Sequence, residues 1–340
     1  MTKKKQTKER TPPMKHELWV KYTQDFIDEN KGIPIGVRQV WYYMSTRLLV
    51  IPHTDQAYKN LDAHLVKARE DGKIDDEAFE DAERNPSGGD GYLSCPRDFW
   101  EDALRVEHEI KDYPRCYKMW DDQPKYIELW IEKKGHVALV SKTSRNYGVK
   151  VVPTKGNTSL TSIKKAVRTR WLPAVDNGKE IYVLCFGDFD ASGVSIRKSL
   201  EERIFKYMET ERPDSSEHLH FVDVCLNEEQ VRDKAGNFLL PKWESKRGDK
   251  AKKDDPNWKK FYEQYPWLII NGKRYGIEID ALDPKKLSEI IQQSIEQHID
   301  ADIWNKTGER AERERDLVRK QYDENKHLFD ELVEKLCPEE

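Results

Sequence analysis

Carboxylates follow two apolar segments of this chain, at the positions where strands would end. Asp188 and Asp190 come directly after the apolar run IYVLCF, and Glu132 ends the segment YIELWIE. Alternate residues of an extended segment point the same way, roughly 7 Å apart, so both aspartates can reach one point. Carboxylates this close repel each other unless a cation lies between them. The spacing therefore predicts a site for a hard divalent cation, Mg²⁺ or Mn²⁺, that also contacts phosphate oxygens.

The surrounding sequence predicts the elements that position these acids. Apolar strand-like runs and helical patterns alternate from residue 126 to residue 226 in the order β-α-β-α-β-α-β, which predicts an α/β fold with a mostly parallel sheet flanked by helices. The carboxyl ends of parallel strands lie at one edge of the sheet, where open α/β sheets bind ligands. We therefore expect Glu132 to meet Asp188 and Asp190, with Lys133 as a neighbouring cation.

A later segment adds two further acids. WLIINGKRYGIEI contains Asn-Gly between two apolar runs, which is a strong hairpin signal. Glu278 and Asp280, in GIEIDAL, again lie two residues apart and are secondary metal candidates, although they could equally well only end the hairpin.

An amphipathic helix is expected at 284–304, followed by a highly charged carboxy-terminal helix without assigned chemistry.

The amino-terminal part predicts a DNA-binding domain. Helical patterns at 14–30, 37–50 and 55–72 precede a wing-like segment at 73–84, which is the order of a winged helix-turn-helix. Any small three-helix bundle would give the same pattern, so both interpretations stay open.

Basic residues suggest contacts with DNA phosphates, which fix position without reading bases. The third helix and the lysine-rich segment 242–260, which can also be interpreted as a solvated loop, supply the candidates: Lys59, Lys67, Arg69, Lys246 and Arg247.

Composition bears on the partners, the redox setting and the membrane association of the chain. The 340 residues carry 59 basic and 63 acidic side chains, a formal charge of -4, which neither demands nor excludes a nucleic-acid partner. The five cysteines are scattered, arguing against a disulfide framework and for a reduced, cytoplasmic setting. No apolar stretch is long enough for a membrane span.

The length predicts more than one domain. The expected organisation is a basic tail (1–15), a winged-helix domain (16–94), linker helices (95–125), an α/β domain (126–300) and a charged helix (301–340).

The motifs WIEKKG and FGDFDASG match the glutamate and the G-D-x-D-x-x-G pattern of the Toprim domain, which topoisomerases, primases and certain nucleases share. The chain from about residue 17 to 298 resembles a compact version of the DNA topoisomerase VI A subunit and the related meiotic double-strand-break protein. In that family a winged helix precedes the Toprim domain and carries a reactive tyrosine in an R-x-x-[YF]-Y stretch. VRQVWYYM places Arg38 and Tyr42 in this register, with Trp41 as a departure.

The resemblance implies a mechanism. Tyr42, assisted by Arg38, would attack a phosphate of double-stranded DNA and become joined to the 5' end, while Glu132, Asp188 and Asp190 hold Mg²⁺ or Mn²⁺. It also implies a homodimer and, as in topoisomerase VI, a separate ATPase subunit. Two alternatives stay open: a Toprim nuclease that hydrolyses DNA with metal-activated water, and a DNA-binding protein that does not cleave. Tyr42 can also be interpreted as aromatic packing in an amphipathic helix.

Overall fold

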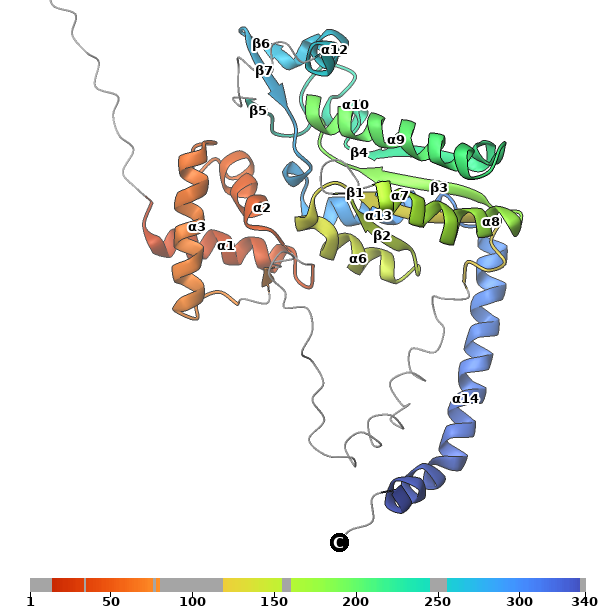
Figure 1. The fold of residues 1–340 in the computed structure, drawn as a ribbon. Helices are drawn as coiled ribbons and strands as arrows, with labels where there is room; N and C mark the ends of the chain where they lie inside the picture. The colour runs from red at the N-terminus through yellow and green to blue at the C-terminus, as the bar shows by residue number, and fades with distance from the viewer. Residues whose placement is uncertain are drawn as a thin grey trace, which may run out of the picture. The chain divides into compact units, whose positions relative to one another are not determined.

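The computed structural model describes residues 14–33, 35–75, 78–79, 119–154, 160–244 and 256–336. The chain forms two compact units, whose elements are labelled in Figure 1. Unit 1 contains the chain up to Glu80 together with a return segment, Asp280–Lys286, and unit 2 contains Asp81–Ile279 and Leu287–Glu340. Residues 1–13 of the predicted basic tail, most of the wing, the linker helices before residue 119, and Lys246 and Arg247 lie outside the described residues.

Unit 1 is built on three helical segments. They are α1 (His16–Glu29), α2 (Val37–Tyr42), which continues as the π-helical turn η1 (Tyr43–Arg47), and α3 (Asp55–Glu70). Thr54 caps α3 by accepting a hydrogen bond from the backbone N–H of Ala57 at 3.3 Å, which satisfies one free N–H of the first turn. The core side chains are Trp19, Phe26, Val40, Trp41, Met44, Leu61, Leu65 and Ala68. The three predicted helices are confirmed, while the winged-helix arrangement stays a prediction.

The second helix is shorter than its pattern suggested. It was expected to continue to residue 50, but η1 ends at Arg47. Leu49 adopts a left-handed backbone conformation, with φ of 55°, and a residue in this conformation ends a right-handed helix. Pro52, a residue type that ends helices, lies beyond this break.

Unit 2 contains the predicted parallel sheet. Its strands are β1 (Lys125–Ile131), β2 (Lys150–Pro153), β3 (Glu180–Phe186) and β4 (Leu219–Cys225), in the order β2-β1-β3-β4. All three pairings are parallel. Each crossover contains helix: α6 (Val137–Arg145), then α7 (Leu160–Ala166) with η4 (Val167–Trp171) and α8 (Leu172–Asp176), then α9 (Ala191–Glu211). The expectation of an α/β fold with a parallel sheet is confirmed.

The central strands are buried on both faces. Trp130, Val183 and Cys185 pack in one cluster with residues of α7, η4 and α9, including Trp171 and Ile204. Leu129, Ile131, Leu184 and Phe186 alternate with them and are also fully buried. Since successive strand residues point to opposite faces, both faces of the sheet are covered here, which explains why the buried end of β3, from Val183 to Phe186, has no polar position. Figure 1 shows α9 and α6 on opposite sides of the sheet.

A small antiparallel sheet follows the parallel one. It consists of β5 (Trp243–Glu244), β6 (Ile269–Ile270) and β7 (Lys273–Gly276), in the order β5-β7-β6. Asn271 and Gly272 form the turn between β6 and β7, with φ of 50° and 74°. Two positive φ values are what a tight hairpin turn requires, so the predicted Asn-Gly hairpin is confirmed. In the chain, α10 (Glu228–Val231) precedes β5, and α12 (Pro256–Gln264) lies between β5 and β6.

The carboxy-terminal helices divide at a different place from the one predicted. The expected single helix 284–304 is two helices, α13 (Pro284–Glu296) and α14 (Ala301–Leu336). Asp300 causes the break, because its Oδ1 accepts hydrogen bonds from the N–H groups of Asp302 and Ile303, both at 3.1 Å, and so starts a new helix. No helix in the described part of the chain is long and apolar enough to cross a membrane.

Candidate functional site

The carboxyl ends of β1 and β3 bring the predicted acids to one edge of the sheet. The strands are neighbours in register, with Ile131 opposite Phe186. The N–H of Glu132 extends this pairing by donating to the carbonyl oxygen of Phe186 at 3.0 Å. Glu132 therefore lies beside Gly187, directly before Asp188. We call Glu132, Asp188, Asp190 and Glu278 the acid edge.

Glu132 is the least satisfied member of the acid edge. Its Oε2 is buried and has no hydrogen-bond partner. Burial, and then the charges of Asp188 and Asp190, raise the pKa of this carboxyl group to about 7, although Arg197 and Lys133 oppose the increase. The influence of both aspartates means that the three carboxylates share one electrostatic environment.

Glu128, in β1, is also a buried acid, but its carboxylate has hydrogen-bond partners. Glu128 is fully buried, yet it accepts hydrogen bonds from the hydroxyl group of Tyr126 at 2.8 Å and from Nε1 of Trp130 at 3.0 Å. It also pairs with the guanidinium of Arg170. A buried charge with this many partners is structural. By contrast, the carboxylate of Glu132, directly after β1, has incomplete hydrogen bonding.

Asp188 is held from two sides. Its side chain is almost buried, and its Oδ1 accepts a hydrogen bond from the N–H of Ile279 at 2.8 Å. Its Oδ2 lies 3.1 Å from Nζ of Lys133, which is also 3.7 Å from Oε2 of Glu278. The Lys133 ammonium group thus bridges two carboxylates, and the acid edge already attracts a cation.

Asp190 begins α9. Its Oδ1 accepts a hydrogen bond from the N–H of Gly193 at 2.7 Å, which is an N-cap contact. This capping contact by itself gives the acid at this position a structural role. The same carboxylate also raises the pKa of Glu132, so Asp190 both caps the helix and contributes charge to the acid edge.

Glycine is required at three positions around the acids. A Cβ atom on Gly187 would lie 2.6 Å from a terminal guanidinium nitrogen of Arg197 and 3.0 Å from Oε2 of Glu132. One on Gly193 would overlap the carbonyl oxygen of Asp188, and one on Gly276 would lie 2.6 Å from Cβ of Asp190. Real Cβ atoms do not approach neighbours this closely, so larger residues would displace the acid edge.

Arg197 supports the acid edge and was not predicted. It lies on α9 and is almost completely buried. Its guanidinium donates to the carbonyl oxygen of Asp188 at 2.8 Å and to that of Leu226 at 3.2 Å, and its Nε lies 2.9 Å from Oδ1 of Asp223. The sequence did contain a signal, because the buried stripe of α9 is otherwise small or apolar: Ala191, Gly193, Leu200, Ile204 and Met208.

Phe189 joins the acid segment to the small sheet. Its backbone exchanges hydrogen bonds with Ile277 at 2.8 and 3.0 Å. Its buried ring lies between 4.9 and 6.0 Å from those of Phe261, Tyr265 and Trp267. Because Ile277 is paired with Phe189, the next residue, Glu278, lies at the acid edge shortly after the end of β7.

The predicted nucleophile lies in unit 1. Tyr42 is 3% exposed and packs against Trp41 and His53, with ring centroids 4.8 and 5.3 Å apart. Arg38, one turn earlier, lies with its guanidinium carbon 5.9 Å from the ring of Tyr58. In this structure Tyr42 is buried among aromatic side chains, as an aromatic core residue would be. Its catalytic role stays a prediction.

The remaining candidates are dispersed. Asp280 is 9% exposed and belongs to unit 1, whereas Glu278 belongs to unit 2. Lys59 and Lys67 are exposed on α3, but Asp62 and Glu70 on that helix are exposed too, so its surface carries both signs of charge. Arg69 is partly buried, with its guanidinium carbon 5.2 Å from the ring of Phe79.

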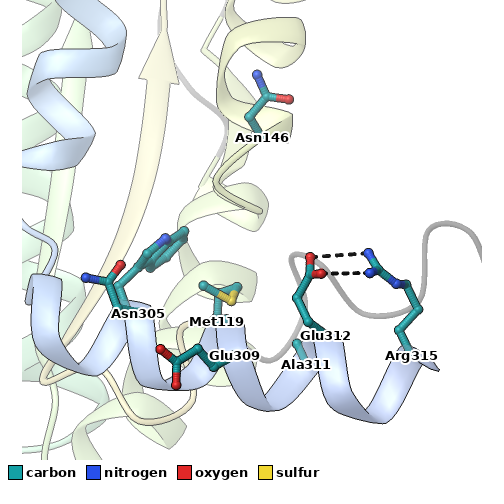
Figure 2. A pocket seen from close by; sticks show the side chains of 9 residues that line it. Met119, Asn146, Asn305, Glu309, Ala311, Glu312 and Arg315 are labelled. Carbon is teal, nitrogen blue, oxygen red and sulfur yellow. Dashed lines mark hydrogen bonds and ion pairs between the residues drawn. The ribbon is translucent and has the colours of Figure 1, made fainter. Parts of the chain in front are cut away.

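A hollow of about 440 Å³ lies elsewhere in unit 2, beside the first turns of α14. Figure 2 shows Glu309, Glu312 and Arg315 along the helix, with Glu312 and Arg315 paired and Asn146 on a neighbouring element. The charged groups nearest each other are thus already neutralised. The acids of the acid edge do not line this hollow.

The acid edge fits a hard cation by its chemistry. Its donors are carboxylate oxygens, which Mg²⁺ prefers, and one of them, Oε2 of Glu132, is buried without a partner. Within the described ranges, no three histidine, cysteine, aspartate or glutamate side chains are already arranged to hold a metal ion. The ammonium of Lys133 lies between two of the carboxylates instead, so Lys133 would have to move aside.

Comparisons with protein-family models, with curated proteins and with solved structures find no match for this chain.

Proposed function

We propose that this protein cleaves DNA in a metal-dependent reaction at the acid edge. The observation that carries the proposal is the buried, unpartnered carboxylate oxygen of Glu132, whose pKa is raised to about 7 beside Asp188 and Asp190. Perturbed groups that share an environment are typical of reactive sites. The resemblance to Toprim proteins, carried by WIEKKG and FGDFDASG, suggests DNA as the substrate.

Each residue of the acid edge has a role in the proposal. Glu132, Asp188 and Asp190 would hold Mg²⁺ or Mn²⁺, and Glu278 is a secondary candidate ligand. When bound there, such an ion stabilises negative charge on phosphoryl oxygens. Lys133 would contact the phosphate from the same side, and Arg197 positions Asp188 through its carbonyl oxygen without touching substrate.

The proposal has two candidate nucleophiles, Tyr42 and water. The resemblance to the topoisomerase VI A subunit suggests Tyr42, which would leave a protein-linked 5' end and would act in a homodimer, with an ATPase subunit as an additional proposed partner. The 3% exposure of Tyr42 favours the second candidate, hydrolysis by water at the acid edge, because a covered phenol cannot reach a phosphate without a conformational change.

Cleavage of supercoiled plasmid tests the proposal. Wild type should cut in Mg²⁺ or Mn²⁺ and not in EDTA, and Asp188→Asn should be inactive. Glu217→Gln is the matched control, since Glu217 is exposed in η5 (Ser215–His218), before the opposite end of the sheet. Loss of cleavage in Tyr42→Phe with a protein-linked 5' end supports the tyrosine. Full activity of Tyr42→Phe supports water as the nucleophile. If the wild-type protein binds duplex DNA but does not cleave it in Mg²⁺ or Mn²⁺, the enzymatic proposal is overturned.

A further inference from the structure

A series of neighbouring aromatic side chains extends from Phe189, beside the acid edge, to partly exposed positions of unit 2. The buried ring of Phe189, between the two aspartates in sequence, stacks on Trp267 with centroids 6.0 Å apart and planes 17° apart. Trp267 in turn lies 5.5 Å from Phe238. Trp267 and Phe238 are partly exposed, whereas Phe189 is 2% exposed. We call these three side chains the aromatic row.

Two cations lie over the outer rings of the row. The guanidinium carbon of Arg232 is 4.9 Å from the ring centroid of Trp267. Nζ of Lys242 is 4.3 Å from the centroid of Phe238 and 5.8 Å from that of Tyr275. Among the described residues, neither cation has a carboxylate partner. Lys273, on the same small sheet, differs, because it pairs with Glu244 at 2.9 Å.

Local backbone structure fixes this arrangement. Arg232 and Phe238 are opposite each other in an antiparallel bridge. The turn between them is closed by Asp233, whose Oδ1 accepts a hydrogen bond from the N–H of Asn237 at 2.7 Å, and it includes Gly236 with φ of 90°. A Cβ on Gly236 would lie 2.9 Å from a terminal nitrogen of Arg232. The backbone positions of Arg232 and Phe238 are therefore preorganised.

Aromatic rings with cations beside them suit one class of ligand, a single-stranded nucleic acid. Unpaired bases stack on aromatic side chains, and the phosphates between them pair with lysine and arginine. A duplex cannot use the rings, because its bases are already stacked on one another. Cations without carboxylate partners also favour a polyanion over a neutral apolar partner.

We propose that Trp267 and Phe238, with Arg232 and Lys242, bind single-stranded nucleic acid that continues from the acid edge. One base stacks on the partly exposed ring of Phe238, another on the guanidinium plane of Arg232 that lies over Trp267, and the phosphates contact Lys242. The connection to the acid edge rests on the proposed cleavage function, but the binding itself requires no metal and no reaction.

The test is binding of a fluorescent single-stranded oligothymidylate to the full-length protein, measured by anisotropy in EDTA. The double variant Phe238→Ala, Lys242→Gln should bind about tenfold more weakly than wild type, or worse, since stacking and charge are both lost. The conservative variant Phe238→Trp should retain binding. Circular dichroism and thermal unfolding establish that each variant is folded.

A matched control exists on α14, where Nζ of Lys326 lies 5.9 Å from the ring of Tyr322. The double variant Tyr322→Ala, Lys326→Gln should bind the oligonucleotide as wild type does. A duplex of the same length should be insensitive to the Phe238 and Lys242 substitutions.

Three results would overturn the proposal: no binding by wild type at micromolar concentrations, equal weakening by both double variants, or equal weakening for the duplex. Failure of the cleavage function is distinguishable, because Asp188→Asn should lose cleavage and keep oligonucleotide binding.

Discussion

At the scale of single residues, the environment of Glu132 opposes its negative charge. Burial, Asp188 and Asp190 raise the pKa of its carboxyl group to about 7, above an ordinary value near 4.3. Between these values the folded chain holds a proton that the unfolded chain has released. The free energy of unfolding therefore decreases as the pH rises through this window.

This sign gives a prediction for Glu132→Gln. In EDTA, wild type should lose about 1–3 kcal/mol of stability relative to the variant between pH 5 and pH 8, because only wild type must ionise a buried carboxyl group. Thermal unfolding at a series of pH values measures this difference. At pH 8, Mg²⁺ should stabilise wild type more than Glu132→Gln, since the metal compensates the charge. Parallel pH profiles for the two proteins would contradict the interpretation.

A second prediction concerns the glycine at the start of α9. Gly193→Ala should lower stability by at least about 1 kcal/mol and reduce cleavage, because its Cβ would overlap the carbonyl oxygen of Asp188. Gly135→Ala is the control, since a Cβ there would meet no atom within 4 Å. Urea unfolding and plasmid cleavage report the two effects. Equal behaviour of the two variants would mean that the acid segment can shift without loss.

At the scale of elements, α9 connects the acid edge to β4. Arg197 binds the carbonyl oxygens of Asp188 and Leu226 and the carboxylate of Asp223. Arg197→Met should therefore cost about 3 kcal/mol, because it leaves buried polar groups without partners. Lys198→Met, at the next and exposed position of α9, should stay within about 0.5 kcal/mol of wild type. Chemical denaturation measures both, and a small effect at Arg197 would show that water replaces the guanidinium.

The elements also show what the sequence could predict. Alternating apolar runs predicted the parallel sheet, and Asn271-Gly272 predicted the hairpin, because both signals are local. Arg197 was missed since its partners, at Asp188, Asp223 and Leu226, come from two strand ends. The break before α14 was missed because capping by Asp300 competes with an amphipathic pattern that continues through it. The hydrogen bond from Ile279 to Asp188 joins residues 91 positions apart, a distance that no local pattern reaches.

At the scale of the whole molecule, unit 1 includes residues from two distant parts of the chain. The return segment contributes Leu282, which is 5% exposed, and Asp283, whose carboxylate lies 4.0 Å from the guanidinium of Arg47. The predicted boundaries, with one domain ending at residue 94, did not include this segment. Sequence patterns could not reveal it, because a short apolar stretch does not indicate which unit it completes.

Leu282→Ala tests this composition. Truncation of a buried leucine should cost about 2–5 kcal/mol, and the loss should appear in α1, α2 and α3. Hydrogen exchange followed by mass spectrometry should show faster exchange in peptides from residues 16–70 than in peptides from β1 and β3. Leu49→Ala, at a side chain that is 77% exposed, is the control. Faster exchange confined to β1 and β3 would mean that Leu282 belongs with unit 2.

The return segment also affects the order of events during synthesis on the ribosome. Helices α1 to α3 are translated first, but residues Asp280–Lys286 of their unit are translated only after more than two hundred intervening residues. The strands of the parallel sheet leave the exit tunnel earlier than this segment. We therefore expect the amino-terminal unit to be completed only after the parallel sheet has been synthesised, and a nascent chain arrested at residue 270 to be cut by protease within its first seventy residues more readily than the released protein.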